Sequence, residues 1–437
     1  MSAPKHLLPG QTTRRAGDLL YVSTIFPVDG DGRAVQSASH SPHMGDSDVY
    51  TQSSVILGEL ARRVEADGSS VDRVLRVEVQ LAATADFGEF KLAWIDAFGD
   101  EPPARTTIVV GDDQVVPGTL VTLNAVALNG GSSAQRETIH TDEAPDPMPY
   151  EHVPQAIRGG HWVYPSALPA CDYETGIPLG VGKNLPAFPY YANDATDQAE
   201  YVFANLQKVM QAAGTEVANI IKAHLYEPSL STFPDVDAVW ARYMPRPPTR
   251  ASMAARDLLV ERAVFVANLL GVMPDESMEI VETRKGIHWH PVLVRKVNFT
   301  PGIAVGDDWL FLAGQVPVPD FLTGVVGTGP SKLRHYFSDI EMQTETTMRL
   351  IQDQIDSNGF ELRDVVDAHI FLVHAQRDYR GFERAWNRLM ADAGIDDPPP
   401  ITLIPSRQRD GGTGIMFLGP DEHLRPDIEI DFILHRS

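Results

Sequence analysis

The feature that most constrains the fold of this chain is an internal repeat of about 146 residues. A tryptophan preceded by Ala or Val recurs at Trp94, Trp240 and Trp386, and both intervals are 146 residues (240−94 and 386−240). A helix-ending glycine and a proline-rich junction recur with nearly the same spacing, at Gly68, Gly214 and Gly359 and as PPART, PPTRA and PPPIT. Because three separate landmarks keep one register, we expect three tandem copies of one folding unit.

Each copy shows the same predicted order of elements, ββ-α-β-α-ββ. In the second copy, Val202, Leu206, Val209 and Met210 lie on one face of a helix with a 3.6-residue period. The segments VLRVEVQL, IIKAHLYE and VVDAHIFL read as the central strand of each copy. The sequence thus predicts an α/β (α+β) fold with repeats at 1–130, 150–271 and 293–437. The segments between them, 131–149 and 272–292, are rich in Pro, Asp and Glu and are predicted to be linkers.

The predicted units are incomplete as single domains. A sheet covered by two helices on one face leaves its other face apolar and in need of a partner. Since 437 residues exceed the roughly 250–300 at which one core stops growing, the three copies can supply that partner to one another. We therefore expect the chain to close into a ring of three, with the three Trp residues in the helix-to-sheet cores.

Composition narrows the classes of function. The formal net charge of −23 argues against a nucleic-acid partner, because phosphate binding needs clustered Lys and Arg. The single cysteine, Cys171, excludes an intrachain disulfide and a cysteine-based metal cluster. An N-terminal apolar leader and an apolar run of about 18 residues are both lacking, so a cytoplasmic protein without a membrane partner is expected.

Three motifs give the repeat a family resemblance. AGQVP in the third copy, PPART in the first and the terminal IEIDFIL are similar, in order, to strand signatures of the RidA (YjgF) family of imine and enamine deaminases. Members of that family are usually homotrimers with a small-molecule cleft at each subunit interface. The resemblance therefore implies a monomeric pseudo-trimer with three chemically different clefts. It also implies a small carboxylate-bearing substrate, hydrolysis of a C=N or enamine bond, and no cofactor.

The resemblance assigns candidate residues to these clefts. The family's carboxylate-gripping Arg corresponds to Arg105 and Arg250, whereas the third copy has Ile401. The family's water-activating Glu is kept only as Glu429; Thr122 and Phe265 take its place elsewhere, with Glu261 as the alternative to Phe265. Further candidate substrate-binding positions are Ser23 and Ser166, Gly314 with its backbone N–H between Ala313 and Gln315, and Gly10, His152 and Phe299 at the family's N-terminal Tyr.

Weaker candidates rest on residue type alone. Cys171 lies near the expected cleft wall, although a lone buried thiol is usually inert. His224 and His369 share a register in the central strand, where the first copy has Glu78, and they either point into clefts or are satisfied core histidines. The His288 and His290 pair lacks a third ligand, so no metal site is predicted. The segment 323–330 lacks the strand-turn-helix context of a phosphate loop.

The leading functional expectation is a hydrolase of imines or enamines in small carboxylated metabolites, with Arg105 or Arg250 as clamp and Glu429 as base. Capture of the imine by an internal nucleophile, giving a ring, is a related outcome. The scattering of Arg and Glu over separate copies keeps open a ligand-binding or regulatory protein without catalysis. A chorismatase-like enzyme is a further alternative, although the extended C-terminal signature of those enzymes is not found. If catalysis survives, we expect one working cleft.

Overall fold

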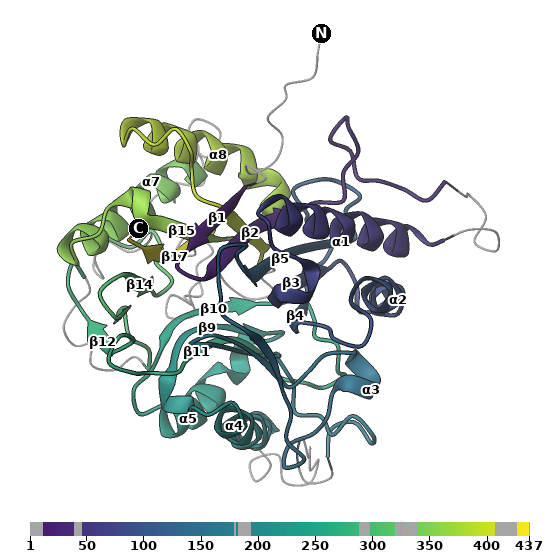
Figure 1. Ribbon diagram of the computed structural model, residues 1–437. Coiled ribbons are helices and arrows are strands. Elements are labelled where there is room, and N and C mark those ends of the chain that lie inside the picture. Colours follow the sequence, from purple (N-terminus) through teal and green to yellow (C-terminus); the bar gives the residue numbers. More distant parts are fainter. Residues whose placement is uncertain are drawn as a thin grey trace.

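Three similar units surround a common centre in the computed structural model of the chain (Figure 1). The structure describes residues 12–38, 46–178, 181, 194–287, 298–319, 325, 339–406 and 426–436. In each unit the helices lie on the outside and the sheet faces the centre, so the α/β (α+β) pseudo-trimer predicted from the repeat is confirmed.

The first unit follows the predicted order ββ-α-β-α-ββ. Its sheet has the strand order β1-β2-β5-β3-β4, in which β3 and β4 are parallel and the other pairs are antiparallel. Its elements are β1 (Thr13–Ala16), β2 (Leu19–Ile25), α1 (Asp48–Ala66), β3 (Val74–Leu81), α2 (Phe87–Phe98), β4 (Ala104–Val109) and β5 (Val121–Leu128).

The second and third units repeat this topology. The second contains β7 (Ala156–Gly159), β8 (Trp162–Pro165), α4 (Asp194–Ala212), β9 (Ile220–Glu227), α5 (Phe233–Tyr243), β10 (Thr249–Ala254) and β11 (Val266–Val272). The third contains β13 (Gly302–Val305), β14 (Trp309–Leu312), α7 (Asp339–Ser357), β15 (Val365–Leu372), α8 (Ala375–Asp392), β16 (Ile401–Pro405) and β17 (Ile428–His435).

The segments between the repeats also take part in the sheets. Residues 131–149 contain β6 (Arg136–Ile139), which pairs with β7 and forms the edge of the second sheet; the short α3 (Met148–Glu151) follows it. Residues 272–292 contain β12 (Ile280–Thr283), which pairs with β13 in the same way. These segments therefore connect the repeats and add a sixth strand to the sheet that follows.

Local sequence explains where the long helices end. Ser47 caps α1, because its side chain accepts a hydrogen bond from the Tyr50 N–H at 3.0 Å. Gly68, Gly214 and Gly359 follow α1, α4 and α7 with φ values of +80°, +85° and +75°. A residue with a side chain adopts this left-handed conformation at a cost, which is why glycine recurs at all three ends.

Each unit has its own core between helices and sheet. Trp94 on α2, Trp240 on α5 and Trp386 on α8 are almost fully buried there, as the sequence predicted. The opposite faces of the three sheets share one central core, in which Tyr21 of the first unit, Trp162 of the second and Trp309 of the third belong to one cluster. The rings of Trp162 and Trp309 lie 4.9 Å apart between centroids. The apolar second face of each sheet is thus covered by the other units.

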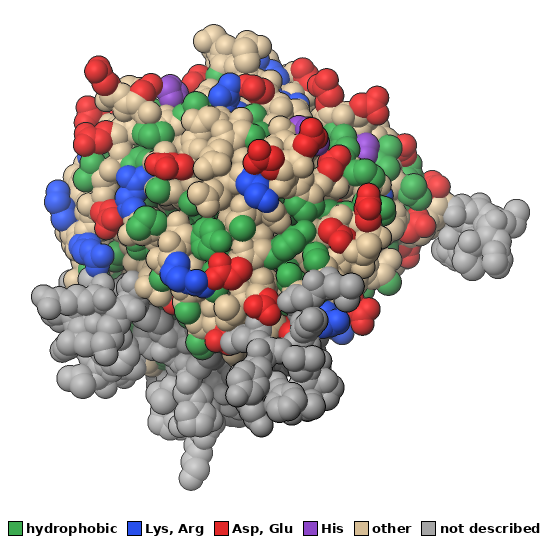
Figure 2. All heavy atoms as spheres, turned by 90° about the horizontal axis from the view of Figure 1, so that it is seen from below, with side chains coloured by type: hydrophobic (Ala, Val, Ile, Leu, Met, Phe, Trp, Pro, Cys, Tyr) green, Lys and Arg blue, Asp and Glu red, His purple; other side chains and the backbone are tan. Residues whose placement is uncertain are grey.

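The molecular surface agrees with the acidic composition. On the face shown in Figure 2, acidic side chains are widely spread and the basic ones are scattered, so this face has no continuous basic track. Within the described ranges, no helix has the length and apolar character needed to cross a membrane.

Candidate functional site

Strand pairing shows which residues of the three repeats are equivalent. Arg105 lies opposite Val77, Arg250 opposite Ala223 and Ile401 opposite Ala368, each at the same place beside the central strand. The two Arg residues therefore occupy equivalent positions, and an apolar side chain takes the third.

The same register corrects one assignment. Glu429 lies opposite Phe371 and Thr122 opposite Gln80, whereas the residue opposite Tyr226 is Val266. The predicted equivalent Phe265 is therefore wrong by one residue, and its side chain packs on the helix side of the sheet. The alternative Glu261 is also wrong, because it is exposed in the loop between β10 and β11.

Each interface joins the start of one repeat's fourth strand to the end of the next repeat's second strand. The Ala167 N–H donates to the Arg105 carbonyl at 3.0 Å, and the Gly314 N–H donates to the Arg250 carbonyl at 3.2 Å. At the third interface the Leu403 N–H donates to Thr24 Oγ1 at 2.8 Å. We call these interfaces 1/2, 2/3 and 3/1 after the repeats that meet there. The Gly314 N–H, predicted to polarise a substrate, is already used in this interface.

At interface 1/2 the guanidinium of Arg105 is enclosed by protein groups. Its Nε donates to Thr107 Oγ1 at 2.8 Å and one terminal nitrogen donates to the Glu151 carbonyl at 2.9 Å. The Glu151 carboxylate lies 3.5 Å away, and the Trp94 ring centroid lies 4.8 Å from Arg105 Cζ. Burial lowers the pKa of Arg105 to about 10 and raises that of Glu151, and the attraction between the two groups opposes both shifts. Glu151 therefore supplies the carboxylate that faces Arg105 within the protein.

Two further candidates at this interface hold the fold together. Ser166 Oγ donates to the Pro154 carbonyl at 2.7 Å and accepts from the Arg105 N–H at 3.2 Å. His152 has a positive φ of 54°, its ring nitrogen lies 2.5 Å from the Gly99 carbonyl, and its own carbonyl accepts from Trp94 Nε1. These contacts stabilise the junction between repeats. They use hydrogen-bonding groups of Ser166 and His152 that a ligand would otherwise need.

Interface 2/3 is built differently around Arg250. Its guanidinium donates to Asp237 Oδ1 at 2.7 Å, and Asp237 Oδ2 accepts from the Asn298 amide at 2.6 Å. Rings of Phe233, Trp240 and Phe299 lie 5.1–5.7 Å from Arg250 Cζ. Asp237 belongs to α5 of the same repeat, and its side chain is 18% exposed whereas that of Arg250 is 4% exposed, so solvent reaches this ion pair from the Asp237 side.

Glu429 reaches the same interface from the third repeat. A Cβ atom on residue 314 would lie 1.7 Å from Glu429 Oε1 and 3.0 Å from the Ala251 Cβ, so only glycine leaves room for this carboxyl group. Ala251 follows Arg250 in β10, which brings the Arg of repeat 2 and the Glu of repeat 3 to one interface. Burial, with the nearby Asp431 charge, raises the pKa of Glu429 well above its ordinary value, against the influence of Lys222.

A second carboxyl group near Arg250 was missed by sequence reasoning. Glu227, the last residue of β9, is fully buried, and neither of its carboxyl oxygens has a hydrogen-bond partner among the described residues. Burial raises its pKa to about 8, against the attraction of Arg250. The equivalent residues in the other two repeats, Leu81 and Leu372, are apolar, so a carboxyl group at the strand end where both other copies have Leu was the available signal. Glu151 and Asp237 were also missed, because only tertiary contacts bring them to the Arg residues.

Interface 3/1 has Ile401 at the Arg position and Thr122 at the position of Glu429. Ile401 takes the Arg position and is buried, while Thr24 bonds to Leu403. Ser23 Oγ accepts from the Thr12 N–H at 3.2 Å and from the Arg63 guanidinium at 3.2 Å. Arg63 in turn pairs with Glu59. The polar side chains named at this interface thus bond to other protein groups.

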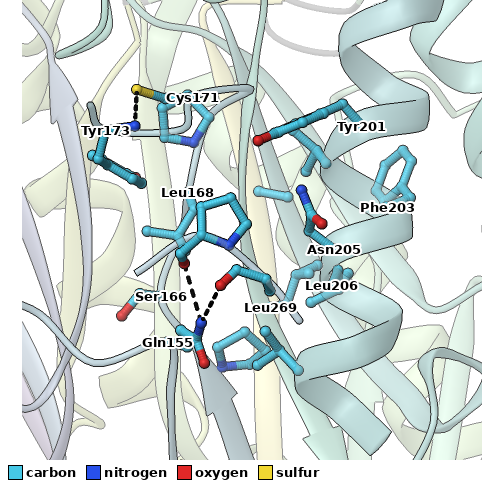
Figure 3. A pocket seen from close by; sticks show the side chains of 17 residues that line it. Gln155, Ser166, Leu168, Cys171, Tyr173, Tyr201, Phe203, Asn205, Leu206 and Leu269 are labelled. Carbon is cyan, nitrogen blue, oxygen red and sulfur yellow. Dashed lines mark hydrogen bonds between the residues drawn. The ribbon is translucent and has the colours of Figure 1, made fainter. Parts of the chain in front are cut away.

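Cys171 lines a pocket within the second repeat rather than an interface. The pocket lies between α4 and the segment that follows β8, and its cavity volume is about 50 Å³ (Figure 3). Its wall is largely apolar, with polar groups from Gln155, Tyr201 and Asn205. Burial raises the pKa of the Cys171 thiol, which also accepts a hydrogen bond from the Tyr173 N–H. Cys171 is therefore a neutral thiol at physiological pH, which makes it a poor nucleophile.

His224 and His369 point toward the centre of the ring, not into the interfaces. They and Glu78 occupy equivalent positions on β9, β15 and β3, and all three are buried where the sheets converge. Asp431 Oδ2 lies 2.9 Å from His224 Nε2, and Asp431 Oδ1 lies 3.1 Å from His369 Nδ1. Burial lowers the pKa of His224 to about 4, although Asp431 opposes this shift. We call this buried polar group the axial cluster; it includes Arg76, Lys222 and Asp367 as well.

Some sequence expectations fall on residues outside the described part of the chain. Gly10, His288 and His290 are among them, as is the segment 323–330 apart from Val325.

Comparison with known proteins relates the second and third repeats to one protein family. A family model described as Endoribonuclease L-PSP matches residues 184–266 and 294–408. A RutC family protein of Saccharolobus solfataricus is 30% identical over 108 residues, which are 25% of this chain and 79% of that protein. A 2-iminobutanoate/2-iminopropanoate deaminase of Dermatophagoides farinae is 24% identical over 137 residues, 31% of this chain and 95% of the relative.

A third relative is the chloroplastic Reactive Intermediate Deaminase A of Arabidopsis thaliana. It is 27% identical over 123 residues, which are 28% of this chain and 58% of that curated protein. Each of these alignments has about the length of one repeat, which agrees with three family subunits joined in one chain.

Proposed function

Because the chain belongs to the RidA (YjgF) family, we propose that it hydrolyses the C=N bond of a small carboxylated imine, or of the enamine that tautomerises to it, at interface 2/3. One observation carries this proposal. The Glu429 carboxyl group lies against Gly314, and the Gly314 N–H donates to the Arg250 carbonyl at 3.2 Å. Among the described interfaces, this one combines an Arg at the clamp position with a carboxyl group on the last strand.

Arg250 is proposed to bind the substrate carboxylate. A planar guanidinium offers two parallel N–H donors to a carboxylate, which Lys does not. The ion pair with Asp237 keeps the guanidinium oriented until substrate replaces it, while the rings of Phe233, Trp240 and Phe299 form an apolar wall around it.

Glu429 is proposed to act first as an acid and then as a base. Its raised pKa favours a protonated carboxyl group, which can give its proton to the imine nitrogen. The resulting carboxylate then accepts a proton from water as the water oxygen attacks the iminium carbon. Return of that proton to nitrogen releases ammonia, the hydroxyl proton goes back to Glu429, and a 2-oxoacid remains. The protonated carboxyl group is restored.

A coupled assay tests this activity. An amino-acid oxidase supplies 2-imino acids, and formation of 2-oxoacid is followed with and without the protein. We expect acceleration by the wild type, loss of it in Glu429→Gln, and full activity in Glu261→Gln, which changes an exposed carboxylate of the neighbouring loop. Background rates with several side chains would refute the proposed activity. Unchanged turnover by Glu429→Gln would exclude that residue.

One observation favours a second candidate, a ligand-binding or regulatory protein without catalysis. Arg105 and Arg250 both already face an internal carboxylate, from Glu151 and Asp237 respectively. Binding of a carboxylate without turnover in the same assay would support this alternative. The acidic surface speaks against an RNA substrate, and a cytoplasmic setting stays a prediction.

A further inference from the structure

The axial cluster offers ligand atoms from all three repeats at one point. Glu78, His224 and His369 each come from the central strand of a different repeat, and they can place one ligand atom each within 4.8 Å of the others. Their side chains are almost completely buried, with exposures of 0%, 3% and 1%. The two imidazole rings lie 4.5 Å apart between centroids. Two imidazoles and one carboxylate form a ligand set that Zn²⁺ and related divalent ions use in proteins.

Neighbouring side chains make contacts that can hold these three ligand groups in place. Asp431 contacts one nitrogen of each imidazole, at 2.9 Å and 3.1 Å, and the other nitrogen of His369 lies 3.5 Å from Asp367 Oδ2. A carboxylate behind a metal-bound histidine is a common arrangement, because it fixes the ring and its proton. Glu78 is held by the Tyr226 hydroxyl and by the Asn124 amide, which is 3.2 Å away.

The histidine of the third repeat lacks hydrogen bonds that would explain its burial. Its Nε2 lies 3.5 Å from Asp367 Oδ2 and its Nδ1 lies 3.1 Å from Asp431 Oδ1, but neither nitrogen makes an aligned hydrogen bond to another described residue. A buried polar group without a partner calls for an ion or water beside it. A small cavity of about 20 Å³ borders both imidazoles and is also lined by Tyr21, Tyr164 and Asn268, which leaves room for about one water molecule in a coordination shell.

Charge balance points the same way. Apart from Glu429, whose raised pKa favours the neutral form, three buried carboxyl groups, Glu78, Asp367 and Asp431, face two side chains that are normally cationic, Arg76 and Lys222. When all three carboxyl groups are ionised, one negative charge is uncompensated, and burial makes such a charge costly. Either a proton on an imidazole or a metal cation can balance it, and both need the same nitrogen lone pairs.

We propose that Glu78, His224 and His369 bind one divalent transition-metal ion of the Zn²⁺ class, which ties the three repeats together on their common axis. Since each repeat gives one ligand, the ion would stabilise the closed ring in proportion to its binding free energy. The three proposed ligands are distinct from Arg250 and Glu429, although Asp431 and Lys222 lie near both groups, and the proposal does not depend on the hydrolase activity.

The test measures metal content and thermal stability of the full chain. The protein is unfolded in a denaturant that contains EDTA, and it is then refolded with or without excess Zn²⁺. After dialysis, its metal content is measured by plasma mass spectrometry and its stability by thermal unfolding. We expect about one Zn²⁺ per chain and a higher melting temperature of the zinc-loaded form. His224→Gln and His369→Gln should each lose the bound metal and the zinc-dependent shift, whereas His140→Gln, an exposed histidine paired with Asp142, should retain both.

Two results would overturn the proposal. One is wild-type protein that refolds but holds less than about a tenth of an equivalent of Zn²⁺, in which case a protonated imidazole balances the cluster. The other is a folded His224→Gln or His369→Gln variant with wild-type metal content. If both histidine variants fail to fold, Glu78→Gln provides the same comparison, because Gln keeps the size of the side chain and removes its charge. Co²⁺ in place of Zn²⁺ adds a visible absorption spectrum that reports nitrogen and oxygen ligation directly.

Discussion

Replacing Arg250 by Lys should lower kcat/KM, whereas the same replacement at Arg105, its equivalent in the first repeat, should not. Lys keeps the positive charge opposite Asp237, which is 2.7 Å from the Arg250 guanidinium, but loses the planar pair of donors. A hydrogen bond to a charged group contributes about 1.5–3 kcal/mol. Loss of one such bond in the transition state corresponds to a fall in kcat/KM of about 10- to 150-fold.

Arg105→Lys is the matched control for this substitution. Arg105 is enclosed by Thr107, Glu151 and Trp94, so its replacement should lower the free energy of unfolding and leave kcat/KM within about threefold of the wild type. Both variants would be assayed with the same 2-imino acid and unfolded in urea. If Arg105→Lys loses activity and Arg250→Lys does not, the assignment of the clamp to interface 2/3 is refuted.

Three further variants probe single contacts. Glu151→Gln removes the carboxylate beside buried Arg105 and should lower the free energy of unfolding in urea by about 3 kcal/mol; an unchanged midpoint would show that the pair contributes nothing. The pKa of Glu227, raised to about 8, means that its contribution to stability is complete below pH 4.5 and is lost as the pH rises toward 8. Glu227→Gln should therefore flatten the fall in stability across that range, and an identical pH profile would contradict the shift. Gly314→Ala places a methyl group 1.7 Å from Glu429 Oε1 and should reduce kcat even where the variant stays folded. Wild-type kcat would contradict this packing.

The fold was predictable because its signals are local and repeated. The Trp, Gly and Pro landmarks fix the register of the three copies, and the central strands begin and end where the sequence patterns do. Helix periodicity and the glycine ends depend on neighbouring residues along the chain, which a single sequence contains.

The site was only partly predictable, because it depends on distances between repeats. The interval from the clamp position to the Glu429 position is 17, 16 and 28 residues in the three copies (122−105, 266−250 and 429−401). A one-residue error in a strand moves a side chain to the other face, which is how Phe265 was chosen over Val266. Spacing along the chain also gave no sign that Glu151 and Asp237 would pair with the two Arg residues.

The convergence of the central strands was equally hidden. Alternation along β9 and β15 makes His224 and His369 share a face with their neighbours two residues away, but it does not say whether that face meets a cleft or the axis. Only closure of the ring brings them beside Glu78 and Asp431.

The central claim is that one interface of three binds and converts the substrate. A crystal structure of the protein with 2-oxobutanoate, a stable product of the proposed reaction, tests it directly. We expect one ligand per chain, with its carboxylate on Arg250 in place of Asp237 and its carbonyl carbon facing Glu429. A ligand bound at Arg105, bound equally at all three interfaces, or bound in the pocket beside Cys171 would contradict this account.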